Sequence, residues 1–273
     1  MVSVTVSPLA GACGAIVSGV DLSVELGVDE IGSIRQALLD HQVIFFRNQC
    51  ITPEQHKAFG RRFGPLLVHP QYVNLEGHPE VLPVLKEANA KENVGGVWHS
   101  DLSNLAAPPL GSILYAKEIP PYGGDTCFAN ACAAYQRLSD EWKERVDNLV
   151  AVHDYMRVFS DRVAPAEREA MRETYPAQHH PVIRTHPETG ERGIYTNIGF
   201  TSHILDVEPE ESKEILRHLE RQIMSPSVQC RVRWQPDTFV MWDNRSAQHA
   251  ATNDFLPMHR RMERVTVFGD RPF

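Results

Sequence analysis

The chain has 273 residues, a formal net charge of −8 and no run of five basic residues, which argues against nucleic acid as a partner. Its 42% hydrophobic and 23% charged residues are ordinary for a soluble globular protein, and the length allows a substantial core. No apolar segment approaches the roughly 20 residues that span a membrane, and the N-terminus lacks a signal-peptide pattern. The five scattered cysteines form no CxxC pair. We therefore expect a cytoplasmic protein with reduced thiols and no membrane partner.

The N-terminal segment predicts two helices that flank a buried strand. Ile31, Ile34 and Leu38 recur at helical spacing, and the apolar run at 43–46 is typical of a buried strand. Thr52 then begins a second helix, because it supplies a hydroxyl cap followed by Pro at the first helical position and Gln at the third. We expect that helix to turn Phe residues inward and to end at the following Gly-Pro pair.

The next segment alternates between loops and strands. Residues 66–97 are rich in Pro, Asn, Glu and Gly, and they predict an active-site lid, with a plain surface excursion as the alternative. The alternating pattern at 111–117 predicts a strand, and 120–125 predicts a turn. Extended structure resumes at 126–128.

The C-terminal half predicts two helices among several strands. One helix is capped by Ser139 and runs to about residue 149, and the other spans 209–223 with an apolar side. The predicted strands are 231–234, 238–242 and 265–268. Because many short strands occur without a βαβ rhythm, we expect a mainly β fold: an antiparallel double-sheet barrel with flanking helices, in one domain over 1–273.

His99, Asp101 and His249 form a candidate metal site. On a strand, residues two apart point to the same side, so His99 and Asp101 could both reach one ion, with His249 as a third ligand. Two histidines and a carboxylate suit Fe(II), Mn(II) or Zn(II). With thirteen histidines in the chain, the His-x-Asp pair alone is weak evidence, and a His–Asp hydrogen bond is the alternative. No HExxH, GxSxG, GxGxxG or Walker motif supports a rival chemistry.

Several long motifs together resemble one enzyme family. They are the runs 98–101, 116–126, 184–187, 231–234 and 242–249. With these motifs the chain is similar to the TauD/TfdA family of Fe(II)/2-oxoglutarate-dependent dioxygenases, and within it most to taurine dioxygenase, over nearly its whole length. This resemblance implies a double-stranded β-helix (jelly-roll, cupin-like) core.

The resemblance also implies which residues hold the cofactors. His99, Asp101 and His249 become the Fe(II) ligands, with 2-oxoglutarate and O2 as cosubstrates. Arg261 matches the arginine that grips the far carboxylate of 2-oxoglutarate, and a planar guanidinium suits that carboxylate. Thr126 matches the hydroxyl that helps it. Without the resemblance, a surface ion pair and a turn hydroxyl would be the simpler interpretations of these two residues.

Substrate contacts follow from the same resemblance. Arg264 matches the arginine that binds the sulfonate, although residues three apart on a strand point to opposite faces, so the pattern alone does not bring Arg261 and Arg264 into one pocket. The other implied substrate contacts are His69 and Tyr72 at the anionic head group, Leu102 beside the iron, and Phe159 and Phe200 as apolar walls. For the aromatic residues, core packing is the alternative.

One departure from the family pattern concerns the substrate. Gly95 stands where taurine dioxygenase has an Asn-rich stretch that helps hold the substrate, so a polar contact is lost and the pocket opens. The resemblance implies hydroxylation of a small anionic substrate, such as the sulfonate taurine, with release of sulfite and an aldehyde in sulfur metabolism. An alkyl sulfate, a phenoxyalkanoate or another carboxylate is the alternative, and a non-catalytic metal-binding jelly roll is a distant one. We also expect a homo-oligomer, either a dimer or a tetramer.

Overall fold

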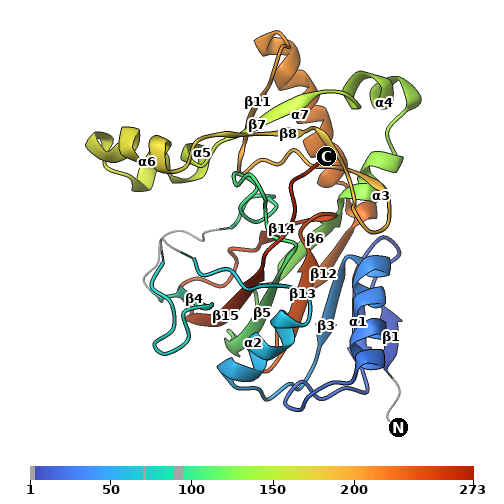
Figure 1. Cartoon of the computed structure of the whole chain (residues 1–273), viewed down its shortest axis with the longest axis vertical. Coiled ribbons are helices and arrows are strands. Elements are labelled where there is room, and N and C mark those ends of the chain that lie inside the picture. Colours follow the sequence, from blue (N-terminus) through green and yellow to red (C-terminus); the bar gives the residue numbers. More distant parts are fainter. Residues whose placement is uncertain (1–3, 70–71, 89–94) are drawn as a thin grey trace.

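Two β-sheets face each other at the centre of the molecule (Figure 1). The structure is a computed structural model that describes residues 4–69, 72–88 and 95–273. Within these residues, the strands of the larger sheet lie in the spatial order β1 (Thr5–Pro8), β2 (Ala15–Ser18), β3 (Val43–Phe46), β13 (Phe239–Asp243), β5 (Gly111–Glu118), β15 (Arg260–Val267) and β4 (Val81–Lys86). Those of the smaller sheet are β12 (Gln229–Val232), β6 (Thr126–Asn130) and β14 (Ala247–Ala251).

Apolar side chains fill the space between the two sheets. They include Phe45 and Trp242 from the larger sheet and Phe128 and Val232 from the smaller one, and all four are buried. Except for the parallel pair β2–β3, neighbouring strands of both sheets run antiparallel. These facing sheets confirm the predicted mainly β fold with a jelly-roll core.

Two helices cover the outer face of the larger sheet. They are α1 (Val28–His41) and α2 (Pro53–Arg61), and Ile34, Leu38 and Phe59 pack from them onto the strands. The predicted cap of α2 is confirmed, because the Thr52 hydroxyl accepts a hydrogen bond from the backbone N–H of Gln55 at 3.3 Å. The Gln55 side chain in turn accepts from the Thr52 N–H at 2.7 Å.

A third layer covers the smaller sheet with helices and short strands. The helices of this layer are α3 (Ala131–Gln136), α4 (Asp140–Val146) and α7 (Pro209–Ile223). The short strands are β7 (Val150–His153), β8 (Gln178–Pro181), β9 (Ile183–Thr185), β10 (Arg192–Ile194) and β11 (Thr201–Ile204). The bounds of α7 match the prediction, whereas α4 ends at Val146 rather than near residue 149, and β12 lies two residues earlier than expected.

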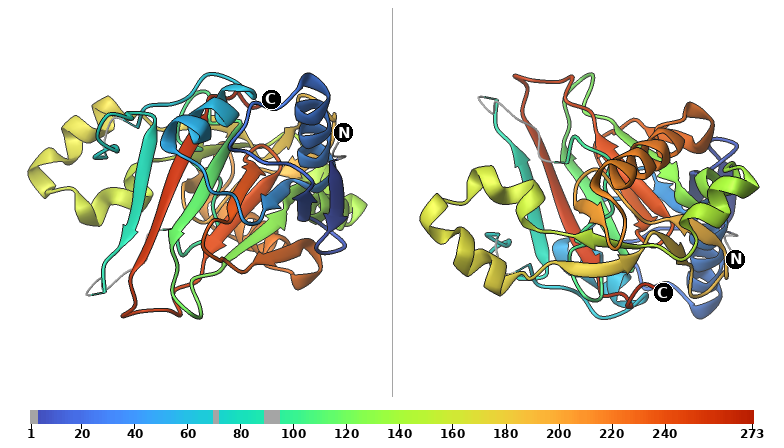
Figure 2. Two further views of the ribbon diagram at one scale, coloured as in Figure 1. Left: turned by 90° about the horizontal axis from the view of Figure 1, so that it is seen from below. Right: turned by 90° about the horizontal axis from the view of Figure 1, so that it is seen from above.

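A short helical arm projects beside β4 at one end of the sheets (Figure 2). It consists of α5 (Met156–Phe159), α6 (Arg168–Thr174) and the 3-10 turns Ser160–Arg162 and Pro165–Glu167 between them; a further 3-10 turn, Pro226–Val228, follows α7. No helix in the described part of the chain is long and apolar enough to cross a membrane.

Side chains alternate between the two faces of strand β15, and this alternation determines which of them face the space between the sheets. The predicted strand at 265–268 is longer in the structure and begins already at Arg260. Met262 packs between the two sheets, whereas Val265 and Val267 pack on the side of α2. Because successive side chains alternate, residues 260, 262 and 264 point inward between the sheets.

Replacing His56 with Gln should flatten the pH dependence of stability. The His56 ring is fully buried against Tyr115 and Phe239, and burial lowers its pKa to about 3. The unfolded chain binds this proton below about pH 6.5 and the folded chain does not until about pH 3, so stability is full above pH 6.5 and falls as the pH decreases through this window.

The free energy of unfolding from urea titrations at several pH values measures this effect. Between about pH 3 and pH 6.5, the free energy of unfolding should depend less steeply on pH in the variant than in the wild type. The difference in slope should be up to about 1.4 kcal/mol per pH unit, which corresponds to one proton. His203→Gln, at an exposed position, is the matched control and should keep the wild-type slope. Equal slopes for His56→Gln and wild type would contradict the assignment.

Candidate active site

Three potential metal ligands meet at one end of the space between the sheets. The ligand atoms of His99, Asp101 and His249 all lie within 4.8 Å of one another. The Asp101 Oδ1 is 3.7 Å from the His99 Nε2 and 4.0 Å from the His249 Nε2. This group was predicted from the sequence, and it is the one such group in the described ranges.

The local backbone differs from the expected strand. His249 lies on β14, and His99 pairs with it through an isolated antiparallel bridge with N–H to carbonyl distances of 3.0 and 2.9 Å. Asp101 lies in the turn that follows, and Leu102 has a positive φ of 48°. A tight turn, rather than strand periodicity, therefore brings the carboxylate next to the two imidazoles.

Hydrogen bonds orient these ligands. The His99 Nδ1 lies 2.8 Å from the Val97 carbonyl, which accepts its proton and leaves Nε2 facing Asp101. The Asp101 Oδ2 accepts from the Ser112 hydroxyl at 2.7 Å, so Oδ1 stays directed at the imidazoles. The Asn244 side chain holds the Asp101 backbone on both sides, accepting from its N–H at 2.6 Å and donating to its carbonyl at 2.9 Å. Such supporting bonds fix the direction of metal ligands.

Asn244 belongs to a buried polar cluster, although the sequence predicted no role for it beyond its place in the run 242–249. Its neighbour Asp243 accepts from the Arg245 guanidinium at 2.9 and 2.7 Å, and from the His186 Nε2 at 3.0 Å. These contacts hold the pKa of Asp243 well below its usual value although burial opposes this. The ion pair fixes the turn between β13 and β14, on which Asn244 and the start of the His249 strand depend.

The three ligands fit a divalent metal ion. Burial lowers the pKa of His249 to about 3, so its imidazole is neutral. Burial opposes ionisation of Asp101, but the nearby charge of Arg264 holds the pKa of this carboxyl well below its usual range. Neutral imidazole and ionised carboxylate are the forms that bind a metal ion. Two nitrogen donors and one oxygen donor match the set used by non-haem Fe(II) oxygenases.

A cavity of about 720 Å³ opens beside the three ligands. Its walls are mainly apolar, with strands of both sheets, the arm around α5 and the described part of 66–97 contributing. Residues 70–71 and 89–94 of the predicted lid lie outside the described residues. The predicted site residues that line the cavity are His69, Tyr72, His99, Asp101, Leu102, Thr126, Phe159, Phe200, His249 and Arg264.

Arg261 does not line this cavity, and its neighbour Arg260 does. Arg261 points to the other side of β15, where it is half-exposed and lies 3.6 Å from Glu118 and 3.5 Å from Glu263. Arg260 is buried and shares the inward face of β15 with Arg264. The structure therefore does not bring the predicted Arg261 into the cavity and places the preceding residue, Arg260, there instead. Strand alternation explains the difference, because residues four apart share a face and residues three apart do not.

Arg260 lines the same cavity as Thr126, and Trp234 lies next to both. Its guanidinium carbon is 5.6 Å from the centre of the Trp234 ring, and the Trp234 Nε1 donates to the Thr126 hydroxyl at 3.0 Å. At Gly124, which has a φ of 68°, a Cβ atom would approach the Arg260 Cδ to 3.4 Å. The Arg260 Nε has no hydrogen-bond partner among the described residues, and burial lowers the pKa of this guanidinium to about 10. A buried cation with a free donor is a ready site for an anion.

Arg264 lies next to the metal ligands. Its Nη1 is 3.2 Å from the Asp101 Oδ1, and in the part of the chain that the structure describes its Nε has no hydrogen-bond partner. His69 is buried at the same end, with its ring edge-to-face against Tyr72 at 4.5 Å. Burial, followed by the charge of Arg264, lowers the pKa of His69 to about 4, so this imidazole is neutral.

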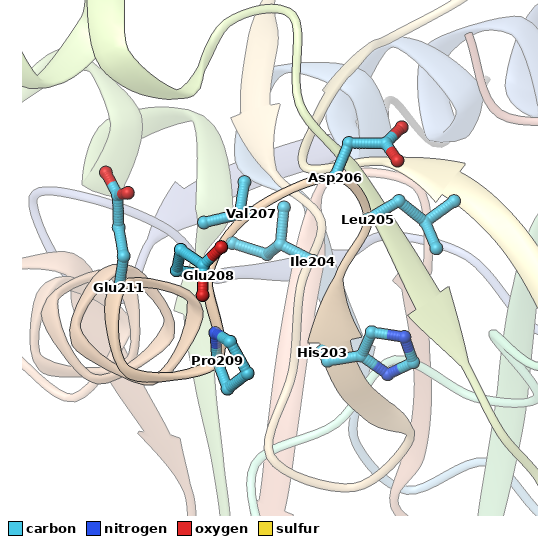
Figure 3. Close-up of a pocket in the computed structure, with 8 residues that line it drawn as sticks. All are labelled: His203, Ile204, Leu205, Asp206, Val207, Glu208, Pro209 and Glu211. Atoms are coloured by element: carbon cyan, nitrogen blue, oxygen red, sulfur yellow. The ribbon is translucent and has the colours of Figure 1, made fainter.

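A second surface pocket lies between β11 and the start of α7, and it contains none of the predicted site residues (Figure 3). Its polar side chains are His203 and three exposed or half-buried acids, Asp206, Glu208 and Glu211. Nothing in it resembles the converging ligands of the first cavity, so we place the chemistry at His99, Asp101 and His249.

Comparison with known proteins agrees with this geometry. The model of the taurine catabolism dioxygenase TauD, TfdA family matches residues 5–266. An alpha-ketoglutarate-dependent sulfate ester dioxygenase from Pseudomonas putida is 33% identical over 98% of this chain and 90% of its own. An alkylsulfatase from Acinetobacter baylyi is 32% identical over 96% of this chain and 84% of its own. The crystal structure of a taurine dioxygenase from Burkholderia xenovorans has a TM-score of 0.87 and 37% identity, over 99% of this chain and 91% of that one.

The chain therefore belongs to the TauD/TfdA family and is a 2-oxoglutarate-dependent dioxygenase. Fe(II), 2-oxoglutarate and O2 are its cofactor and cosubstrates, and a small organic molecule is its substrate. The predicted enzyme class is confirmed, and the non-catalytic jelly roll is set aside.

Replacing Asn244 with Ala should weaken metal binding by about 10- to 100-fold, since losing a group that orients a ligand has effects of that size. Calorimetric titration of the metal-free protein with Mn(II) measures the change. Asn130→Ala is the control, because Asn130 is also buried but donates to Ala12 and Gln42. Equal loss of affinity in both variants would mean that Asn244 acts only on overall stability.

Proposed function

We propose that Arg260 and Thr126 bind 2-oxoglutarate and that Arg264 binds an anionic organic substrate with an apolar body. The observation that carries this proposal is the pair of inward-facing arginines on β15, with one beside Thr126 and the other 3.2 Å from Asp101. Each guanidinium has a buried donor without a partner. Two anion sites in one cavity suit a cosubstrate and a substrate that are both anionic.

The binding of 2-oxoglutarate rests on the surroundings of Arg260. Its guanidinium offers a planar, permanently charged donor to the far carboxylate, and the Thr126 hydroxyl lies in the same corner. The low polarity of this corner strengthens the attraction, since burial has already removed water from the cation. Bound by His99, Asp101 and His249, Fe(II) supplies O2-driven oxidation, in which one oxygen atom goes to succinate as CO2 leaves and the other goes to a substrate carbon.

Arg264 orients the substrate in this proposal. Its position at Asp101 brings an anionic head group next to the metal ligands, so a C–H bond close to the head group faces the reacting centre. His69 is neutral and buried, and it contributes hydrogen bonding without adding charge. Leu102 occupies the wall beside Asp101 and closes that side against water.

The remaining wall suits an apolar tail. Phe159, Phe200 and Val84 line the cavity, and at its mouth Val73 and Leu85 are 90% and 48% exposed. Large exposed apolar side chains at the rim of a pocket are typical of a surface that receives an apolar ligand.

Acidic groups in the cavity are few. Among the described residues that line it, Asp101 is a ligand and Glu76 is exposed, so no buried carboxylate is available for the ammonium group of taurine. Gly95, with a φ of 87°, lies against the His99 ring, since an added Cβ atom would be 3.5 Å from the His99 Cε1, and this glycine places no side chain there. We therefore favour an alkyl sulfate or an alkyl sulfonate with an apolar chain over taurine, in keeping with the sulfate ester dioxygenase and alkylsulfatase relatives.

The chemistry of release follows from the attacked carbon. Hydroxylation of the carbon that carries a sulfate oxygen gives an unstable adduct, which collapses to an aldehyde and sulfate. Hydroxylation of a carbon that carries a sulfonate sulfur gives an aldehyde and sulfite by the same collapse. In both cases the C–O or C–S bond breaks heterolytically, and the hydroxyl proton is lost to water.

Four further expectations stay proposals. We propose one domain over the described residues, which the family match over 5–266 supports. We also propose a lid role for 66–97, a dimer or tetramer, and a cytoplasmic location. The anionic nature of the substrate rests on Arg264 and His69.

Arg260→Leu should raise the 2-oxoglutarate concentration needed for half-maximal succinate formation by about 10- to 100-fold, because a hydrogen bond to a charged group contributes about 1.5–3 kcal/mol. Arg261→Leu, one residue away on the other face, is the matched control and should change it by less than about twofold, the range of a surface ion pair. Succinate formation and anaerobic spectroscopic titration of the Fe(II) enzyme with 2-oxoglutarate measure this. Equal effects in both variants would remove Arg260 from the proposed role.

A series of linear alkyl sulfates, from ethyl to dodecyl, should reveal the apolar wall. Each added CH2 group contributes about 0.8 kcal/mol when buried, so KM should fall about fourfold per carbon until the chain passes the rim and then level off. The readout is substrate-dependent succinate and aldehyde formation, with taurine and the matching alkyl sulfonates as comparisons. A KM independent of chain length, or taurine as the best substrate, would contradict the proposed substrate class.

A further inference from the structure

We propose that a buried polar network centred on His153 positions two walls of the substrate cavity and so controls where a substrate lies relative to the metal ligands. This inference rests on the proposed function of the cavity. His153 lies at the end of β7, next to Thr201 on the neighbouring strand β11 (Figure 1). It does not line the cavity, so it acts only through the residues that it holds.

The two walls come from segments that are far apart in the sequence. One is the turn that follows Asp101 and carries Leu102. The other carries Gly199 and Phe200, both of which line the cavity. Gly199 lies directly against His99, since a Cβ atom at this glycine would be 3.0 Å from the His99 Cβ. A small shift of either segment therefore moves the cavity wall relative to the ligands.

Hydrogen bonds tie these segments together through His153. Its Nδ1 is 2.9 Å from the Ser103 hydroxyl, next to Leu102, and its Nε2 is 3.4 Å from the Thr201 hydroxyl, next to Phe200. The Asn197 side chain adds a second link, because it donates to the Ser103 hydroxyl at 3.0 Å and accepts from the Phe200 N–H at 2.8 Å. All of these polar groups are buried.

The neutral ring bonds both hydroxyls in either tautomer. In one, the Ser103 proton points to the His153 Nδ1, because Asn197 donates to the Ser103 oxygen, and the His153 Nε2 donates to Thr201. In the other, Nδ1 donates to Ser103 and the Thr201 hydroxyl donates to Nε2. A neutral imidazole supplies exactly one acceptor and one donor, and the ring is fully buried without a charged partner. An apolar ring of similar size at this position leaves both hydroxyls without this partner.

Hydrogen–deuterium exchange of the whole protein tests the positioning role without any ligand. In His153→Phe, amide exchange in residues 102–105 and 198–201 should rise together, by about tenfold or more, because local opening becomes easier. His153→Gln should restore part of the protection, since an amide offers both a donor and an acceptor. Unchanged exchange in either segment of His153→Phe would overturn the proposal.

His56→Phe is the matched control for lost stability. His56 is also fully buried and makes one polar contact, at 3.3 Å to the Ile113 carbonyl on the outer side of the larger sheet. It should lower the thermal midpoint while exchange in 102–105 and 198–201 stays at the wild-type level. A rise in these segments that matches that of His153→Phe would mean that His153 acts only through overall stability.

Turnover of octyl sulfate supplies the functional readout. In His153→Phe, KM for this substrate and the amount of succinate formed per aldehyde should each rise about fivefold or more, because a shifted wall spoils the alignment of the C–H bond. Binding of 2-oxoglutarate should stay unchanged, since Arg260 and Thr126 lie outside the network. Loosened segments with wild-type KM and coupling would overturn the inference. Failure of the wild-type enzyme to turn over any of the anionic chains would instead contradict the proposed substrate class.

Discussion

The backbone pairing of His99 with His249 is the contact on which the active site depends. Two hydrogen bonds join these residues, which are far apart in the sequence, and the centres of their rings lie 4.1 Å apart. Asp101 follows this bridge in a tight turn, and the Asn244 side chain forms hydrogen bonds with its backbone N–H and carbonyl. The core of the jelly roll, built from β13, β6 and β14, fixes the position of His249. The other two ligands are then placed by the bridge and by the turn that follows it.

Charge in the cavity is balanced around a single buried carboxylate. A buried carboxylate is costly unless it is paired, and Asp101 is paired with Arg264 and with the Ser112 hydroxyl. Among the described residues, the Nε of the same Arg264 has no hydrogen-bond partner, and Arg264 lines a cavity with mainly apolar walls. In the proposed function, one arginine thus both keeps Asp101 ionised and binds the anionic head group of the substrate.

Local signals in the sequence predicted α1, α2, α4 and α7 and singled out His99, Asp101 and His249, but they did not single out Arg260. The caps and the apolar spacing of α2 and α7 are contained within each helix, so no distant contact is needed to recognise them. The first half of β15 reads Arg-Arg-Met-Glu-Arg, with charged residues on both faces, so the alternation that marks a strand is lost there. The exchange of Arg260 for Arg261 follows directly. His153 has no local signal, since its partners Ser103 and Thr201 are joined only in space.

Chemistry and specificity occupy different parts of the fold. Thr126 comes from β6, the central strand of the smaller sheet. His249 comes from the neighbouring β14, which pairs with β6 on one side and with His99 on the other, so both positions leave little room for change. The apolar wall comes from the edge strand β4 and from the arm that carries Phe159, which have neighbours on fewer sides. Substitutions at such edges disturb fewer contacts than substitutions in a central strand. The walls at Leu102 and Phe200 lie nearer the ligands, and they are the ones that the proposed network of His153 joins through Ser103 and Thr201. In that proposal a rigid link keeps these two walls aligned with the ligands, whereas β4 and the arm are not part of it.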